Sequence, residues 1–174
     1  QVPAWRETKY SLWQERRMEV YAAQITCMDR NIGRVTAYLE EHGLSENTIV
    51  MYQHDNGGCH VEYLPERKGN WTREKTTDGK GTPIRPGNIP DLMPRRQETF
   101  QSYGYGWAYV SNTPFREYKH FAHEGGISSP FIVAWPKGID KKNNGRIERQ
   151  PGHLIDLMAT CLDAAGVDHP RIFN

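Results

Sequence analysis

The residues best suited to chemistry lie at positions 51–60, in the stretch MYQHDNGGCH. A run of β-forming residues at 48–52 gives way to polar side chains, among them Asp55 and Asn56. In open α/β sheets, ligands bind beyond the carboxyl ends of the strands. A carboxylate and a carboxamide offer hard oxygen atoms, which suit Ca²⁺ or Mg²⁺ better than zinc. Asp55 and Asn56 are therefore candidate metal ligands, although two ligands are too few for either ion.

The same stretch has an interpretation that needs no metal. Asn56-Gly57 is the favoured dipeptide of a type I′ hairpin turn. Downstream, Cys59, Val61 and Tyr63 alternate with polar residues, as a returning strand would. Local sequence leaves both interpretations open and favours the tight turn.

A second group of candidates lies at 118–126, in YKHFAHEGG. Lys119 precedes a Glu-Gly-Gly turn, where its ammonium would suit an anionic group. A lone lysine beside a turn is, however, more often an ordinary surface residue. His120 and His123 are three residues apart and would share a helical face, but no HExxH-type motif surrounds them, so we do not predict a zinc pair.

The remaining polar and thiol candidates are interpreted as structural. His153 and Asp156, at the head of an expected C-terminal helix, suit capping or packing better than catalysis. The three cysteines are odd in number and form no C-x-x-C pair, which argues against a zinc or redox motif. Cys27 and Cys161 fall on apolar helical faces, so we predict buried free thiols at both positions.

Apolar periodicity predicts the elements that must position these candidates. Spacings of three and four residues predict a helix over about 14–41, ended by Gly43. Residues 47–52 and 131–135 predict strands buried on both faces, and helix followed by buried strand is the order of an α/β sheet with parallel strands. A last helix is expected at about 152–166, with a buried face of Leu154, Leu157, Met158, Cys161, Leu162 and Ala165.

Residues 64–112 are rich in proline and charge and lack sustained periodicity, which predicts a long loop region. Within it, 66–96 holds eight lysines and arginines against four acids. Such a loop would attract an anionic substrate, and a solvated surface loop is the plainer alternative. Asn70 begins a glycosylation sequon, which is a weak signal.

Composition excludes several classes of function. The chain has 174 residues, 37% of them hydrophobic, with 16 glycines, which is enough for a globular core. The net charge of +1 gives no field for nucleic acid or an anionic membrane, and no apolar run approaches a membrane span. The chain starts at Gln1 rather than at an initiator Met, so we expect it to begin inside a longer product.

Four segments, taken in order, resemble the type I sulfatases, and most closely the bacterial arylsulfatases of the alkaline-phosphatase-like superfamily. The resemblance covers about 15–170 and implies an α/β fold: part of a mixed, largely parallel sheet flanked by helices, incomplete at both ends. The segments are RMEVYAAQITCMDRNIGRV, NTIVMYQHDNGG, SYGYGWAYVSNTPFREYKHFAHEGGISSPFIVAWPKGI and QPGHLIDLMATCLDAAGV.

The resemblance implies hydrolysis of sulfate esters by a formylglycine made from the cysteine of a C-x-P/A-x-R motif. It implies a Ca²⁺ ion, with Mg²⁺ the less favoured alternative, held by acidic residues and an asparagine. By position, Asp55 and Asn56 correspond to metal ligands, and Lys119 to a catalytic lysine that contacts the sulfate. His123 stands where the family varies and is expected only to line the substrate pocket. The resemblance therefore shifts the preference at Asp55 and Asn56 from a simple turn to a turn that aims two ligands.

Important parts of that site are missing from the sequence. None of the three cysteines begins a C-x-P/A-x-R motif, and the paired N-terminal aspartates of the family are absent. We therefore expect 1–174 to be the second half of a sulfatase catalytic domain, with 64–112 lining the site. Alone it is expected to be inactive and prone to self-association, because a half sheet leaves strand edges uncovered. The formylglycine and the rest of the domain would come from the remainder of its own chain.

Three functions remain in competition. The first is an arylsulfatase-like sulfuric ester hydrolase acting on a sulfated small molecule or carbohydrate. The second is a phosphodiesterase or phosphonate hydrolase of the same superfamily, and the third is a non-catalytic, truncated metal-binding module. Family habit suggests a periplasmic or extracellular location. Four aromatic residues would suit a sugar or aryl ring, or simply packing: Tyr103, Tyr105, Trp107 and Tyr109.

Overall fold

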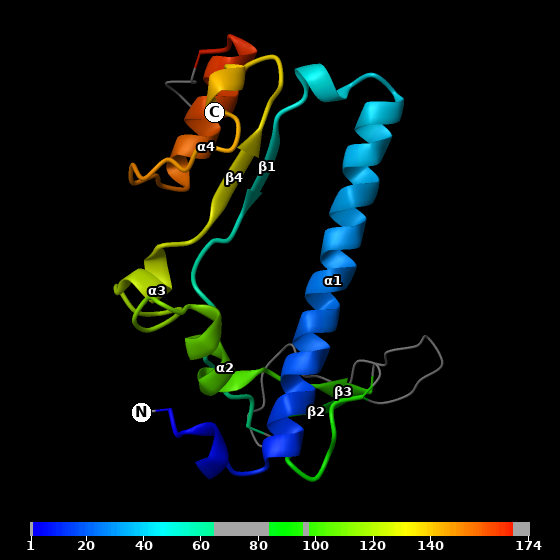
Figure 1. The fold of residues 1–174 in the computed structure, drawn as a ribbon, viewed down its shortest axis with the longest axis vertical. Helices are drawn as coiled ribbons and strands as arrows, with labels where there is room; N and C mark the ends of the chain where they lie inside the picture. The colour runs from blue at the N-terminus through cyan, green and yellow to red at the C-terminus, as the bar shows by residue number, and fades with distance from the viewer. Residues whose placement is uncertain (1, 65–83, 96–97, 169–174) are drawn as a thin grey trace, which may run out of the picture.

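The computed structural model describes residues 2–64, 84–95 and 98–168. One long helix, α1, runs along the long axis of the molecule, and the shorter elements gather mainly near its two ends (Figure 1). None of the helices in these stretches is long and apolar enough to cross a membrane. In chain order the elements are η1 (Trp5–Glu7), α1 (Ser11–Glu41), η2 (Ser45–Asn47), β1 (Val50–Gln53), β2 (Arg85–Pro86), β3 (Thr99–Phe100), α2 (Gly104–Ser111), α3 (Glu124–Ile127), β4 (Phe131–Ala134), η3 (Lys141–Asn143) and α4 (Ile155–Ala165).

Helix α1 confirms the predicted helix and begins three residues earlier than expected. Its C-terminus is closed by Gly43, whose φ of 66° is left-handed. The Gly43 N–H donates to the Glu40 carbonyl at 3.0 Å, and the Leu44 N–H donates to the Leu39 carbonyl at 2.8 Å. These two bonds form a Schellman motif, which satisfies carbonyl groups that the helix leaves without partners.

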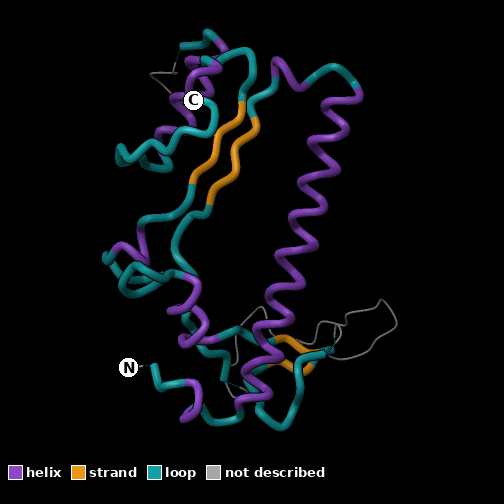
Figure 2. The backbone as a smooth tube through the Cα atoms, viewed as in Figure 1, coloured by secondary structure: helices purple, strands orange, loops and turns teal. Residues whose placement is uncertain are grey.

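The predicted α/β class is confirmed, and its small sheets are mixed in direction. Strands β2 and β3 pair in parallel. Strands β1 and β4, which lie side by side in Figure 2, pair antiparallel, with Val50 opposite Ala134 and Gln53 opposite Phe131. The parallel direction inferred from the order of helix and strand is thus wrong for β1 and β4. The chain turns back between them, and the His54 N–H donates to the Pro130 carbonyl at 3.3 Å, which continues the ladder beyond the strands.

Burial of the strands and of the last helix differs from prediction. Strand β1 is half-buried, and all four residues of β4 are exposed. Helix α4 ends at a left-handed Gly166 as expected, but Leu157 and Leu162 alone among its predicted core residues are half-buried. The apolar patterns are real, yet no described segment covers these faces.

The cysteine prediction is half right. All three cysteines are free thiols. Cys27 and Cys161, which were predicted to be buried, are exposed. Cys27 lies on the C-terminal two-thirds of α1, where the apolar stripe also faces solvent. Val35 of that stripe is 60% exposed.

The core of the described residues lies where the start of α1 meets α2 and the loop region. Its buried apolar side chains are Trp13 and Ala108. The indole of Trp13 donates to the Leu92 carbonyl at 3.1 Å, and that of Trp107 donates to the Gln14 carbonyl at 2.9 Å. Tyr21 and Tyr103 stack with ring centroids 4.7 Å apart. This packing holds α2 against the first turns of α1.

The predicted loop region 64–112 falls partly outside the described residues. The sequon at Asn70 and most of the basic residues lie in 65–83 and 96–97, which the structure does not describe. The described part contains β2, β3 and the helix α2. Helix α2 was not predicted from the sequence. It contains glycines 104 and 106, and its apolar residues do not form one stripe with helical spacing.

Candidate functional site

The stretch after β1 bends sharply, but it does not form the predicted hairpin. Residues 58–64 form no strand, so the alternation of Cys59, Val61 and Tyr63 does not correspond to a returning strand. The turn bonds instead to a segment far along the chain: the Gly57 N–H donates to the Gly126 carbonyl at 3.0 Å. The turn is therefore placed by tertiary contacts rather than by its own strand.

The second candidate stretch lies directly against this turn. The Lys119 N–H donates to the Gly58 carbonyl at 3.1 Å, three residues after Asp55. Glu117 and His120, on either side of Lys119, have left-handed φ angles of 64° and 81°. The two groups of residues singled out in the sequence, 51–60 and 118–126, are at least 58 positions apart and are thus joined by a backbone hydrogen bond.

Glycine is required where the two stretches meet. A methyl group at Gly57 would collide with the Gly125 carbonyl oxygen, and one at Gly125 would collide with the Glu117 carbonyl oxygen. Gly126 would meet the Phe121 carbonyl in the same way. The paired glycines of both motifs therefore permit close backbone approach, which a residue with a Cβ would prevent.

The side chains of Asp55 and Asn56 offer unused oxygen atoms. The Asp55 carboxylate is exposed, and within the described ranges it makes no hydrogen bond or ion pair. The half-buried Asn56 donates through Nδ2 to the Gly57 carbonyl at 3.1 Å, which leaves Oδ1 as an open acceptor. These oxygens fit a hard divalent cation in kind. No group of three or more His, Cys, Asp and Glu residues in the described part could hold a metal, so the pair would form only part of a coordination shell.

The Lys119 side chain is half-buried, and no acidic side chain of the described residues forms an ion pair with it. An ammonium group in that situation keeps its charge available for an anion that reaches the turn. The backbone bond between Lys119 and Gly58 thus places two residues with acceptor oxygens and one lysine on neighbouring segments.

His123 is linked to the turn through Gly126, which bonds to both His123 and Gly57. It precedes α3 with an exposed side chain, and its carbonyl accepts from the Gly126 N–H at 2.8 Å. Residues 118–123 form no helix, so His120 and His123 do not share a helical face. The His120 ring instead lies edge-on to His60, with centroids 5.4 Å apart.

Comparison with known proteins shows the family of this chain. The sequence model of the family described as Sulfatase matches residues 2–167. This chain belongs to the sulfatase family. It is 32% identical over 158 residues to an arylsulfatase of Klebsiella aerogenes, covering 87% of this chain and 30% of that protein.

Two further relatives show the same pattern of coverage. An uncharacterized sulfatase of Schizosaccharomyces pombe is 33% identical over 171 residues, which is 96% of this chain and 28% of that protein. The mouse steryl-sulfatase is 28% identical over 150 residues, which is 86% of this chain and 18% of that protein. The sulfatase chain described here thus spans less than a third of the length of these relatives.

Sequence reasoning missed a polar cluster around the buried Arg17 of this sulfatase chain. The Arg17 guanidinium is 4% exposed and donates to the Ser102 carbonyl at 2.7 Å and to Glu62 at 3.0 Å. Burial lowers the pKa of Arg17, and the adjacent Glu62 opposes that shift. Asn88 donates to Glu62 and to the Ser102 hydroxyl. The only signal was that Arg17 lies four residues before Tyr21, on the apolar stripe of α1.

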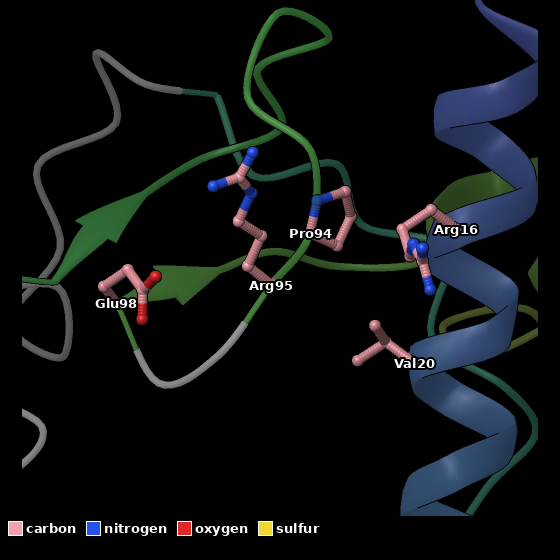
Figure 3. Close-up of a pocket in the computed structure, with 5 residues that line it drawn as sticks. All are labelled: Arg16, Val20, Pro94, Arg95 and Glu98. Carbon is pink, nitrogen blue, oxygen red and sulfur yellow. The ribbon is translucent and has the colours of Figure 1, made fainter.

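An open hollow of about 630 Å³ lies elsewhere, between α1 and the segment around Pro94. Arg16 and Val20 line it from the helix, and Arg95 and Glu98 line it from the opposite segment (Figure 3). It shares no residue with the turn or with Lys119, so it is separate from the candidate site.

Proposed function

We propose that this chain supplies two metal ligands and a sulfate-binding lysine to an enzyme that hydrolyses sulfate esters. The observation that carries the proposal is the hydrogen bond between Lys119 and Gly58, which joins the lysine to the turn of Asp55 and Asn56. Family membership supports the reaction class, since the sulfatase family takes in nearly the whole chain.

The proposed metal is Ca²⁺, with Asp55 and Asn56 as two of its oxygen ligands. A bound calcium ion would act as a Lewis acid that neutralises the charge of sulfate oxygens. Asp55 contributes an exposed carboxylate without a protein partner among the described residues, and Asn56 contributes the oxygen left open by its own amide bond. The other ligands would come from outside the described residues.

Lys119 is the proposed catalytic residue, and its role is to bind and orient the sulfate group. No acidic side chain of the described residues pairs with its ammonium, which leaves that charge for an anion. His123 is proposed only to line the substrate pocket, because its exposed side chain lies beside the turn of glycines that contacts Gly57.

The substrate class is proposed from the relatives' names. The relatives named arylsulfatase and steryl-sulfatase imply sulfated small molecules, and a dog relative at 25% identity is named N-acetylgalactosamine-6-sulfatase, which implies a sulfated carbohydrate. We propose a sulfate ester of one of these kinds. A periplasmic or extracellular location stays a prediction.

The nucleophile is proposed to lie outside residues 1–174. Cys27, Cys59 and Cys161 are followed by Met-Asp-Arg, His-Val-Glu and Leu-Asp-Ala, and none of these fits the maturation motif. Residues 1–174 alone are therefore proposed not to turn over sulfate esters, and the complete protein is proposed to supply the missing groups.

The test is turnover of an aryl sulfate by the complete protein and by its Lys119→Ala variant. Loss of a charge that stabilises the reacting group should lower kcat/KM by about 100-fold to 1,000-fold. Lys137→Ala is the matched control, because Lys137 is exposed and bonds through its backbone to Glu46. Full activity of Lys119→Ala would show that the lysine has no role in the reaction. A preference of the complete protein for aryl phosphodiesters over aryl sulfates would show that it is a phosphodiesterase instead.

A further inference from the structure

Asn112, at the C-terminal end of α2, is bonded to the candidate metal turn by its side chain. Its Oδ1 accepts a hydrogen bond from the Gly58 N–H at 3.1 Å. Its Nδ2 donates to the Ala108 carbonyl one helical turn earlier, at 2.5 Å. The amide is thus held from both ends, and its acceptor atom faces the turn.

The peptide groups around Gly58 are held on several sides. Asn112 receives the Gly58 N–H, Lys119 donates to the Gly58 carbonyl, and Gly57 donates to Gly126. Two of these three bonds join backbone to backbone, and only the bond from Asn112 uses a side chain. Asn112 is therefore the one member of this set that substitution can remove without changing the backbone.

Helix α2, which carries Asn112, is itself anchored. The Tyr105 N–H donates to Glu62 at 3.3 Å, and Glu62 is paired with the buried Arg17. A methyl group on Gly58 would collide with the Tyr103 hydroxyl, so the start of α2 also approaches the turn. The bond from Asn112 to Gly58 thus ties the residues that follow Asp55 and Asn56 to the end of an anchored helix.

We propose that Asn112 is a positioning residue that fixes the orientation of the Asp55-Asn56 turn for divalent cation binding. This inference rests on the proposed function, because it assumes that the turn holds Ca²⁺. Partners that orient metal ligands change metal affinity by about 10-fold to 100-fold when they are removed.

The test measures the Ca²⁺ affinity of the complete protein by calorimetric titration with Ca²⁺ alone. Asn112→Ser keeps a hydroxyl that can bond to the Ala108 carbonyl but is too short to reach Gly58. Its Kd for Ca²⁺ should rise about 10-fold to 100-fold. Thr113→Ala is the matched control: it removes the 3.1 Å bond from Thr113 to the Tyr109 carbonyl at the same helix end without touching the turn. Its Kd should stay within about twofold of the wild type.

A third variant separates positioning from general damage to the helix end. Asn112→Asp keeps an oxygen acceptor for Gly58, so its Kd should lie closer to the wild type than that of Asn112→Ser. That partial rescue should persist at high salt, whereas a rescue due only to the added charge would be screened. Thermal unfolding of each variant shows that the titrated protein is folded.

The outcomes distinguish the inference from the proposed function. If Asp55→Ala weakens Ca²⁺ binding and Asn112→Ser does not, Asn112 has no positioning role and the proposed function stands. If Asn112→Ser and Thr113→Ala weaken binding equally, or the rescue by Asn112→Asp disappears in salt, the positioning role is also wrong. If Asp55→Ala leaves the Kd unchanged, the calcium site itself is wrong, and the inference fails with it.

Discussion

Arg17 joins α1 to the loop region through several side-chain contacts. Its guanidinium lies over the Trp13 ring at 4.3 Å and donates to Gln14, Ser102 and Glu62. Since a guanidinium stays charged in proteins, removal of its acidic partner would leave an uncompensated charge in a buried place.

Glu62→Ala is therefore expected to lower the free energy of unfolding by about 2 kcal/mol, because it leaves the buried Arg17 donor without its acceptor while the Glu62 side chain itself is 37% exposed. The matched control is Glu19→Ala, which breaks the exposed pair of Arg16 and Glu19 at 2.6 Å. An exposed pair is worth about 0.5 kcal/mol. Urea unfolding of the complete protein measures both changes, and equal effects would contradict the structural role given to Glu62.

Tyr103 makes stability depend on pH at the alkaline end. Burial raises the pKa of Tyr103 above its usual value of 10.0. The folded-state pKa is raised, so the stability from the neutral phenol is fully present below pH 10 and is lost as pH rises through the folded pKa. Tyr103→Phe should therefore flatten the fall in stability above pH 10, as measured by unfolding at pH 8 to 11. Parallel curves for the variant and the wild type would exclude this linkage.

The helices and strands whose positions depend on nearby residues could be predicted from the sequence. The stripe of α1 repeats every three or four residues, and Gly43 ends it in the only backbone conformation that closes a Schellman motif without strain. The positions of β1 and β4 also followed from local composition, whereas β2 and β3 lie in the stretch predicted to be a loop region. Burial and strand direction did not, because they depend on which segments cover a face and on where a distant part of the chain returns.

Two glycines of this helix region are expected to respond in opposite ways to alanine. Gly43→Ala should destabilise the protein by about 1 kcal/mol, because alanine disfavours the left-handed φ of 66°. Gly33→Ala, in the interior of α1 with open space around a new methyl group, should stabilise it by about 0.8 kcal/mol. Thermal unfolding of both variants measures the two changes in stability. If both changes have the same sign, the assignment of Gly43 as the end of α1 is contradicted.

The site shows the same division between local and distant determinants. The turn after β1 and the position of Lys119 were recognisable from residue types and from resemblance to a family. The contact between Gly58 and Asn112 was not, since the two residues are 54 positions apart and neither has a distinctive local pattern. Glu62 and Arg17 are 45 positions apart and were missed for the same reason.

At the scale of the molecule, the described residues carry apolar faces that no described segment covers. The buried apolar side chains lie at one end of α1, whereas Ile132 of β4 and Met158 of α4 are 60% and 62% exposed. Apolar area removed from water is the main favourable contribution to association, so these faces should seek partners.

Residues 1–174 expressed alone are therefore expected to self-associate. Light scattering after size exclusion should give a mass that rises with protein concentration and exceeds 20.1 kDa. Replacing the exposed Ile132 by lysine should reduce that association, because it adds a charge to the uncovered strand. A concentration-independent monomer with one sharp unfolding transition would contradict the expectation.

The most direct single measurement is the Ca²⁺ affinity of the complete protein with and without the Asp55 carboxylate. Asp55→Ala should weaken Ca²⁺ binding by more than about 100-fold, because a direct ligand is lost rather than a partner that orients one. Asp29→Ala, which removes an exposed carboxylate from the surface of α1, should leave the Kd within about twofold. Equal Ca²⁺ affinity in the wild type and in Asp55→Ala would contradict the assignment and leave the stretch after β1 as a turn without a metal.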